Sequence, residues 1–295
     1  LGPTTVLAPP RIWENMLTGV QVKAADAPAL KRWIFERFRA AAERAEILRA
    51  DGKPIPLGLR LACMLGEVLV YTPIRDQLGL RRAKWASTGG APLGPHTFRF
   101  FRSIGVNLKQ VYGSTETTGL VSLQPSSEAN PTTAGRPCPG IEVKIAERGE
   151  VLVRGPLVFK GYHKNEEATR EVIDSEGWFR TGDAGFVDPR GHLVIIDRAK
   201  DVGALQDGTP FAPQFIENKL KFSPFIPEAV AFGSERPFVT AMIAIDPNTV
   251  GNWAEGRGLA YTGYTDLSQK PEVRELIRDE IRKGNEALPG ATKIR

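Results

Sequence analysis

Residues 112–116 read Tyr112-Gly113-Ser114-Thr115-Glu116, and Tyr112 closes a short segment, 107–112, that we expect to form a β-strand. At the end of a strand, the ring of Tyr112 can be presented at the edge of a sheet as a flat platform for a base. Gly113 lets the backbone approach a ligand closely. Thr115 offers a hydroxyl donor to a phosphate, and Glu116 offers a hard oxygen ligand for Mg²⁺. The same residues would also cap a helix well, so the pentapeptide alone leaves both interpretations open.

The segments around this pentapeptide alternate between strand and helix patterns. We expect a strand over 84–87, a tight turn at Gly89 and Gly90, and a helix over 95–104 before the strand at 107–112. This order is typical of an α/β sheet whose site lies at the carboxyl ends of the strands. The backbone carbonyls of Gly89, Gly90 and Ala91 could then wrap the edge of an adenine ring, although the motif alone favours a plain connecting turn.

A second group of candidate residues lies further along, in 177–183 and 196–201. Asp183 supplies two acceptor oxygens, which suit the two vicinal hydroxyls of a ribose. Arg198 presents a planar fork of donors that can reach the same ribose or a phosphate. The alternative is that 181–183 is only a turn, and that Asp197 and Arg198 form a surface ion pair.

The pattern after Gly140 changes to short strands separated by Gly and Pro turns. These strands are expected at 141–145, 150–154, 184–187 and 192–196. Beyond Arg198 the expected elements are a helix at 215–222, strands at 228–232 and 239–245, and helices at 247–255 and 271–288. We therefore predict a large domain over 1–198, with an α/β part at 1–139 and a β-rich layer at 140–198. A small α+β domain would occupy 199–295.

Composition sets limits on the class of protein. The chain has 295 residues, 41% of them apolar and 25% charged, which is typical of a soluble globular protein. The net charge of +5 is a mild excess, compatible with anionic small molecules or a lipid surface and too dispersed to indicate binding to nucleic acid. Cys63 and Cys138 lie far apart and are expected to be thiols in a reducing compartment such as the cytoplasm.

The sequence also bears on membrane attachment and on common hydrolytic and nucleotide-binding motifs. We expect no run long enough to cross a bilayer and no signal peptide. The segment 26–48 has helical periodicity with many basic residues, so it is either a solvated surface helix or a peripheral membrane contact. His96, His163 and His192 show no metal spacing and are expected to be structural. The chain contains no Gly-x-Ser-x-Gly elbow, Walker lysine loop or Gly-x-Gly-x-x-Gly fingerprint.

Taken together, these blocks resemble the successive core motifs of the adenylate-forming superfamily. The blocks are 87–93, 112–116, 135–137, 149–154, 177–183 and 197–201. Two further stretches, 10–14 and 224–233, resemble the long-chain fatty acid:CoA ligases of that superfamily. The resemblance covers nearly the whole chain and is specific as a set.

The resemblance implies a two-step reaction with ATP, Mg²⁺ and CoA. A fatty carboxylate attacks the α-phosphate of ATP, and the CoA thiol then displaces AMP. By family analogy, Thr115 and Glu116 are catalytic, with Glu116 holding the metal, and Tyr112 stacks on adenine. Asp183 and Arg198 would hold the ribose. Lys200 falls where these enzymes have the hinge of a mobile carboxyl-terminal domain.

Three departures from the family pattern affect the expected activity. The Ser/Thr/Gly-rich phosphate loop ending in lysine is absent, and so is the catalytic lysine near the family's carboxyl terminus. In addition, 202–206 (Val-Gly-Ala-Leu-Gln) replaces the usual apolar–lysine pattern after the hinge. We expect the chain to be a truncated piece that cannot form acyl-adenylate at a useful rate by itself.

Several alternatives stay open at the level of the sequence. The acid could be aryl or medium-chain, or the acceptor could be a carrier protein in place of CoA. A non-catalytic module that retains only the nucleotide site is a third possibility. The acyl chain length and the oligomeric state cannot be read from the residues.

Overall fold

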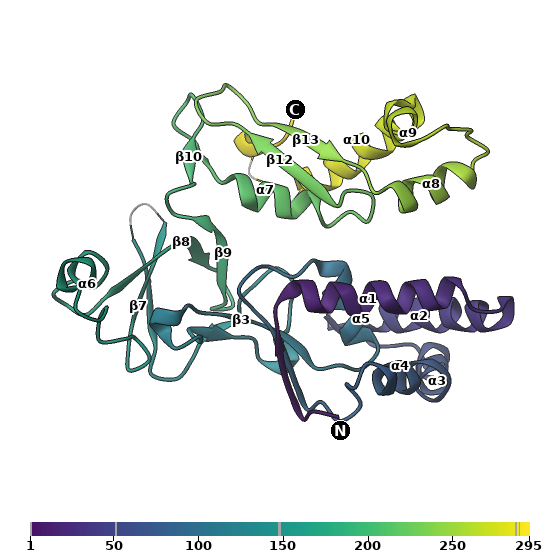
Figure 1. Cartoon of the computed structure of the whole chain (residues 1–295), viewed down its shortest axis with the longest axis horizontal. Coiled ribbons are helices and arrows are strands. Elements are labelled where there is room, and N and C mark those ends of the chain that lie inside the picture. The colour runs from purple at the N-terminus through teal and green to yellow at the C-terminus, as the bar shows by residue number, and fades with distance from the viewer. Residues whose placement is uncertain (1, 51, 147–148, 287, 289) are drawn as a thin grey trace. The chain divides into compact units, whose positions relative to one another are not determined.

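The computed structural model describes residues 2–50, 52–146, 149–286, 288 and 290–295. Its contacts divide the chain into two compact units. The first contains the residues up to Lys144, with Leu152–Thr181 and Phe186–Val194, and the second contains Ile145–Val151, Gly182–Gly185 and Ile195–Arg295. Helices and strands are mixed in the chain (Figure 1), so the predicted α/β class is confirmed.

The first unit is built on a five-stranded sheet in the order β1-β2-β3-β4-β5. The parallel strands are β1 (Thr5–Ala8), β2 (Trp85–Thr88) and β3 (Leu108–Tyr112). The short strands β4 (Ser122–Leu123) and β5 (Arg136–Pro137) continue the sheet in antiparallel pairing. The strands expected at 84–87 and 107–112 are confirmed as β2 and β3, whereas β1 was not predicted.

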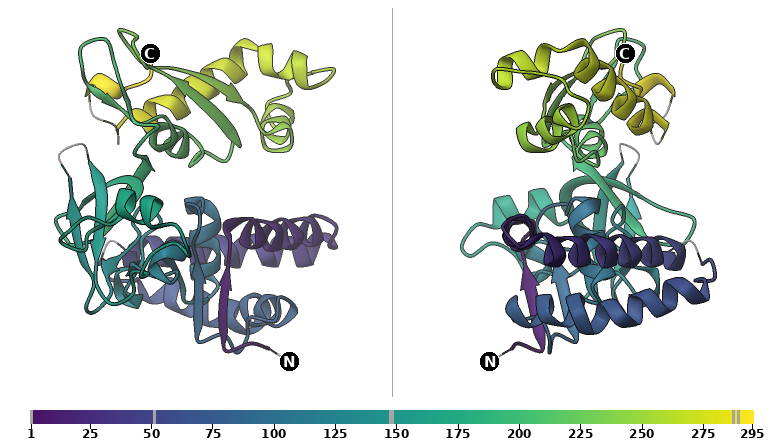
Figure 2. Two further views of the ribbon diagram at one scale, coloured as in Figure 1. Left: turned by 60° about the vertical axis from the view of Figure 1, so that its left-hand side comes forward. Right: turned by 90° about the vertical axis from the view of Figure 1, so that its right-hand side faces the viewer.

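Helix α5 (Pro95–Ser103) packs against β3 of this sheet. Helices α1 (Pro10–Ala25) and α2 (Ala29–Ala50) both pack against α5, and they lie side by side (Figures 1 and 2). The fully buried Trp13 meets Phe101 edge to face at 4.9 Å and donates its indole N–H to the Ala8 carbonyl at 3.2 Å. On the opposite face, Leu7 is 69% exposed. Because side chains alternate along a strand, the core covers one face of β1 and leaves the other open.

A continuous helical segment follows α2. It consists of α3 (Leu57–Gly66), the π-helical turn η1 (Glu67–Tyr71) and α4 (Thr72–Gln77). By length and composition alone, Leu57–Gln77 could cross a membrane, so the expectation that no such run exists was wrong. Charged residues such as Arg60 and Glu67 interrupt the run in the sequence, but helical geometry gathers the apolar side chains on one face. We call this face the α3 surface; its members, each more than half exposed, are Leu57, Leu61, Met64, Leu65, Val68 and Leu69.

A second sheet occupies the region predicted to be rich in strands. Its order is β6-β7-β8-β9, with β6 (Glu142–Ile145), β7 (Glu150–Arg154), β8 (Phe179–Val187) and β9 (Leu193–Arg198). The four expected strands are confirmed, although β8 begins earlier than predicted. Between β7 and β8 lies the short helix α6 (Glu166–Val172), which Asn165 caps by accepting the Ala168 backbone N–H at 3.0 Å.

The remaining elements follow β9 along the chain. They are β10 (Gly203–Ala204), β11 (Pro210–Phe211), α7 (Pro213–Leu220), β12 (Glu228–Phe232), β13 (Thr240–Ala244), α8 (Pro247–Glu255), α9 (Tyr264–Gln269), α10 (Pro271–Glu286) and the 3₁₀ turn η4 (Gly290–Thr292). Helices α7 and α10 pack on the antiparallel pair β12–β13 through Ile216, Ala229 and Ile281. The helix predicted over 271–288 is observed to Glu286, and residue 287 lies outside the described residues. Helix α9 was not predicted. The boundary between domains at 198 and 199 stays a prediction.

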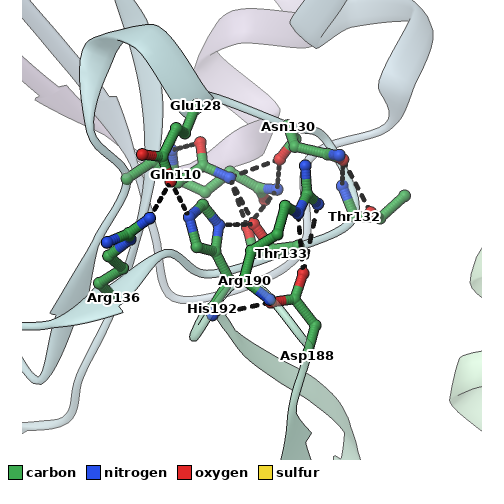
Figure 3. A network of polar contacts seen from close by, with 10 residues as sticks. Gln110, Glu128, Asn130, Thr132, Thr133, Arg136, Asp188, Arg190 and His192 are labelled. Atoms are coloured by element: carbon green, nitrogen blue, oxygen red, sulfur yellow. Dashed lines mark hydrogen bonds and ion pairs between the residues drawn. The ribbon is translucent and has the colours of Figure 1, made fainter. Parts of the chain in front are cut away.

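A buried polar network stabilises the loop between β4 and β5 (Figure 3). His192 is 0% exposed, and its ring nitrogens lie 2.8 Å from Glu128 Oε2 and 3.0 Å from Thr133 Oγ1. The carboxylate of Asp188 accepts the His192 backbone N–H at 2.9 Å, and Gln110 Nε2 donates to the Thr133 carbonyl at 3.2 Å. These contacts support the structural role that the sequence suggested for His192.

Candidate nucleotide site

The loops that follow β2 and β3 lie next to each other at the carboxyl ends of two parallel strands. A Cβ atom on Gly89 would come within 2.7 Å of Val111 Cγ2 and 3.0 Å of the Val111 carbonyl oxygen, so the two chains touch there. Gly90 has a φ of +85°, which favours glycine. The structure therefore brings the predicted residues Gly89, Gly90 and Ala91 beside the end of β3, which carries Tyr112.

Gly113 allows a close approach within its own loop. A Cβ atom at this position would lie 2.5 Å from both the carbonyl carbon of Gly119 and the backbone nitrogen of Leu120. Backbone atoms cannot move aside as a flexible side chain can, so glycine is required there for folding. Gly113 thus has a structural role in closing its own loop. The role predicted for it from the sequence, close approach to a ligand, stays a prediction.

The residues after Gly113 form a compact turn. Thr115–Thr117 make a single 3₁₀ turn, and the Ser114 backbone N–H donates to Thr117 Oγ1 at 2.9 Å. Thr118 then adopts the left-handed conformation with a φ of +52°. The helix-cap interpretation of the pentapeptide is realised only in part, because Thr117 Oγ1 accepts the Ser114 backbone N–H while Ser114 Oγ has no hydrogen-bond partner among the described residues. Neither contact involves the side chains of Thr115 and Glu116, whose ligand-binding roles stay predictions.

Glu116 is held by a segment that the sequence analysis did not single out. Tyr162 Oη donates to Glu116 Oε1 at 3.0 Å, and the Phe159 backbone N–H donates to the Glu116 carbonyl at 2.7 Å. Burial, and then the hydrogen bond to Glu116, raise the pKa of Tyr162. Tyr162 lies 46 residues from Glu116 along the chain, and no spacing rule connects the two.

Asp183 and Arg198 meet within the second unit. Arg198 Nη1 lies 3.0 Å from Asp183 Oδ1, and the Ala199 backbone N–H donates to the Gly182 carbonyl at 2.8 Å. The pairing of Asp197 with Arg198 as a surface ion pair, offered as an alternative, was wrong. Asp197 is 4% exposed, and its carboxylate accepts the Gln214 backbone N–H at the start of α7 at 2.9 Å.

The electrostatics of Asp197 follow from this position. Burial raises the pKa of Asp197, while the backbone hydrogen bonds from Gln214 and Arg198 lower it, and burial is the larger effect. Lys200 is exposed in the turn that follows β9. Its hinge role stays a prediction, as does the convergence of Tyr112 with Asp183 and Arg198 on one nucleotide.

The chemistry of the donor set fits a metal that arrives with its substrate. Among the described residues, no group of three or more His, Cys, Asp or Glu side chains could hold a metal ion. Mg²⁺ in nucleotide enzymes is commonly bound by one or two carboxylates together with substrate phosphates. Glu116, partly exposed beside the exposed Thr115, is a carboxylate of this kind.

Comparison with known proteins identifies the class. The family of AMP-binding enzymes matches residues 1–163, more than half of the chain, and the chain belongs to this family. Its similarity to individual members extends further along the sequence. It is 35% identical to the long-chain-fatty-acid–CoA ligase FadD15 of Mycobacterium bovis over 295 residues, covering 99% of this chain and 48% of that protein.

A further relative agrees with this assignment, and a solved structure shares the fold. The chain is 31% identical to the peroxisomal long chain acyl-CoA synthetase 7 of Arabidopsis thaliana, over 95% of its length and 41% of that protein. The adenylation domain of a carboxylate reductase from Mycobacterium chelonae has the same fold, with a TM-score of 0.58 and 23% identity, over 99% of this chain and 40% of that chain. The chain thus spans about half the length of the curated relatives it matches.

Proposed function

We propose that this chain carries the nucleotide site of an ATP-dependent long-chain fatty acid:CoA ligase. The observation that supports this most directly is the pair of adjacent loops after β2 and β3, with Tyr112 and Glu116 at the same edge of the sheet. Family membership and the names of the relatives point to the same chemistry.

In the proposed reaction, a fatty carboxylate oxygen attacks the α-phosphorus of ATP, the bond to the β-phosphate oxygen breaks, and pyrophosphate leaves. The sulfur of CoA then attacks the acyl carbon, AMP departs with the carboxyl oxygen, and the thiol proton is released. Most of the catalysis is positioning and neutralisation of phosphate charge. Tyr112 would stack on adenine, Thr115 would donate to the α-phosphate, and Glu116 would hold the Mg²⁺ that accompanies ATP.

Asp183 and Arg198, which contact each other, would hold the ribose: Asp183 would accept from its hydroxyls and Arg198 would donate to it. Lys200 would act as the hinge between the two half-reactions. Because the chain contains no glycine-rich loop ending in lysine, we propose that these residues alone bind nucleotide but form acyl-adenylate poorly.

The experiment that tests this proposal is AMP binding by isothermal titration calorimetry. Tyr112→Ala should weaken AMP binding by about ten- to hundredfold, because stacking of a base on an aromatic ring contributes about 1–3 kcal/mol. Tyr112→Phe keeps the ring and serves as the matched control, with affinity near that of the unsubstituted chain. Failure of the unsubstituted chain to bind AMP at all would rule out the nucleotide site.

The identity of the acid and of the acceptor needs a separate measurement. Pyrophosphate exchange with long-chain, medium-chain and aryl acids, carried out on the complete enzyme, distinguishes the long-chain ligase from its alternatives. Thioester detection with CoA or with a carrier protein identifies the acceptor. AMP binding without exchange in any form of the enzyme would favour a non-catalytic nucleotide-binding module.

We also propose that the protein is cytoplasmic and contacts the inner face of an anionic membrane through the α3 surface. The basic helix at 26–48, which the sequence offered as a possible membrane contact, would then be a solvated surface helix. Six exposed aliphatic side chains on one helix face are more than isolated surface hydrophobics. Cationic side chains flank them at both ends of the segment: Lys53, Arg60, Arg81, Arg82 and Lys84 are exposed. The carboxylates among the described residues from 53 to 84 are Glu67, which pairs with Arg75, and the exposed Asp76. This excess of positive charge matches anionic lipid headgroups.

A further inference from the structure

We infer that Tyr162 is a positioning residue that orients the carboxylate of Glu116 for the metal bound with ATP. This inference rests on the proposed function, in which Glu116 holds that metal. Its starting point is the hydrogen bond of 3.0 Å from Tyr162 Oη to Glu116 Oε1, which joins two segments that lie far apart in the sequence.

The same segment holds the backbone of Glu116 as well as its side chain. The Phe159 N–H donates to the Glu116 carbonyl at 2.7 Å, and the Thr118 hydroxyl, which donates to the Thr117 carbonyl at 2.8 Å, lies 3.4 Å from the Leu157 carbonyl. The turn that carries Glu116 is therefore fixed at several points by residues 157–162. A side chain held in this way loses less freedom when it binds a ligand.

Tyr162 is itself held in place by its surroundings. Its backbone N–H donates to Thr169 Oγ1 at 2.9 Å, and Thr169 Oγ1 donates to the Asn165 carbonyl at 2.8 Å. Gly161 has a φ of +145°, and a Cβ atom there would come within 2.7 Å of Thr169 Cγ2. The backbone at Tyr162 is thus fixed by close packing of the loop before α6, while its side chain is 38% exposed.

Aromatic packing fixes the ring of Tyr162. Phe159 meets Tyr162 edge to face with ring centroids 4.8 Å apart, and it meets Phe179 of β8 in the same manner at 5.7 Å. Both contacts use the ring and leave the hydroxyl to Glu116. Removal of the hydroxyl alone should therefore leave the packing of this segment intact.

The choice of a tyrosine at this position has a chemical consequence. A neutral hydroxyl donates a hydrogen bond to the carboxylate without cancelling its charge, whereas Arg or Lys would compete with a cation for that charge. Partners of this kind, one contact away from a metal, fix the orientation of its ligand, and their loss typically costs about 10- to 100-fold in metal affinity. Under the proposed function, Tyr162 is such a partner, because its hydroxyl donates to the carboxylate of Glu116.

The chain supplies a matched control. Tyr261 Oη donates to Glu255 Oε1 at 3.3 Å, so it forms a second hydrogen bond between a tyrosine and a glutamate. This pair lies in the second unit, and the proposed function assigns it no role. Tyr162→Phe and Tyr261→Phe therefore remove the same atom from the same kind of contact.

The test measures how strongly Mg²⁺ enhances ATP binding. Calorimetric dissociation constants for ATP are measured in saturating Mg²⁺ and in EDTA, and AMP affinity is measured in EDTA. In Tyr162→Phe we expect the enhancement by Mg²⁺ to fall about tenfold or more. AMP affinity and melting temperature should stay those of the unsubstituted chain, and Tyr261→Phe should change none of these values.

Two results would overturn the inference while leaving the nucleotide site in place. One is an unchanged enhancement by Mg²⁺ in Tyr162→Phe. The other is ATP binding by the unsubstituted chain that is equally tight in EDTA, since Glu116 would then hold no metal. Failure of the unsubstituted chain to bind any nucleotide would overturn the proposed function, and this inference with it.

Discussion

His192 contacts two side chains from the loop between β4 and β5, Glu128 and Thr133, and has no exposed surface. Replacement by alanine would remove both hydrogen bonds and leave a buried space. We expect His192→Ala to lower the free energy of unfolding by about 2–4 kcal/mol, as measured by urea denaturation.

The matched control for this substitution is His163→Ala. His163 is exposed, so its replacement should change the free energy of unfolding by no more than about 0.5 kcal/mol. If the two variants unfolded at the same urea concentration, the network around His192 would have no structural importance.

Local residue chemistry was predictable, and distant partners were not. Tyr112 and Glu116 stood out because a strand pattern ends in a polar pentapeptide, which is a short-range signal. The contact of Glu116 with Tyr162 depends on how a loop far along the chain folds back, and nothing in the spacing reveals it. The same holds for the preference of Arg198 for Asp183 over its neighbour Asp197.

At the scale of the structural elements, Gly113 decides whether the loop after β3 can close. A methyl group there would meet the backbone of Gly119 and Leu120. We expect Gly113→Ala to destabilise the protein by about 2–3 kcal/mol in urea denaturation.

Gly58→Ala is the control for Gly113→Ala, because we expect it to raise the free energy of unfolding. Gly58 lies in α3 with open space around its Cα, so alanine should stabilise the helix by about 0.5–1 kcal/mol. Equal stabilities of the two variants would argue against the close approach at Gly113.

Periodicity predicted most of the elements. The strands β2 and β3 and the helix α5 were expected because alternating and helical patterns are clear there and turns separate them. β1 was missed although it is no shorter than β2, because Thr5–Ala8 becomes a strand by pairing with β2, a contact far along the chain that no local pattern reveals. The continuous helix Leu57–Gln77 was missed because charged residues interrupt its apolar run in the sequence. The helix itself continues through these charged residues without a break.

At the scale of the whole molecule, the α3 surface should govern association with lipid. We expect sedimentation with vesicles of mixed phosphatidylcholine and phosphatidylglycerol, and much weaker sedimentation with phosphatidylcholine alone. Leu65→Glu should lower the partition coefficient about tenfold or more, because burial of a leucine contributes about 1.5–3 kcal/mol.

Leu30→Glu on α2 is the control, since Leu30 is 69% exposed, against 59% for Leu65, but lies outside the α3 surface. A loss of binding in Leu30→Glu alone would assign the membrane contact to α2. Concentration-dependent dimerisation that Leu65→Glu abolishes, without vesicle binding, would show that the surface meets a second copy of the chain.

The position of β1 bears on how this protein should be handled. Among the strands that the structure describes, β1 is paired on one side only, with β2. Its outer backbone groups offer a template onto which a strand of another molecule can add, although an edge of only four residues limits such pairing. We therefore expect any edge-to-edge association to increase with protein concentration, so dilute preparations are the better starting point for binding studies.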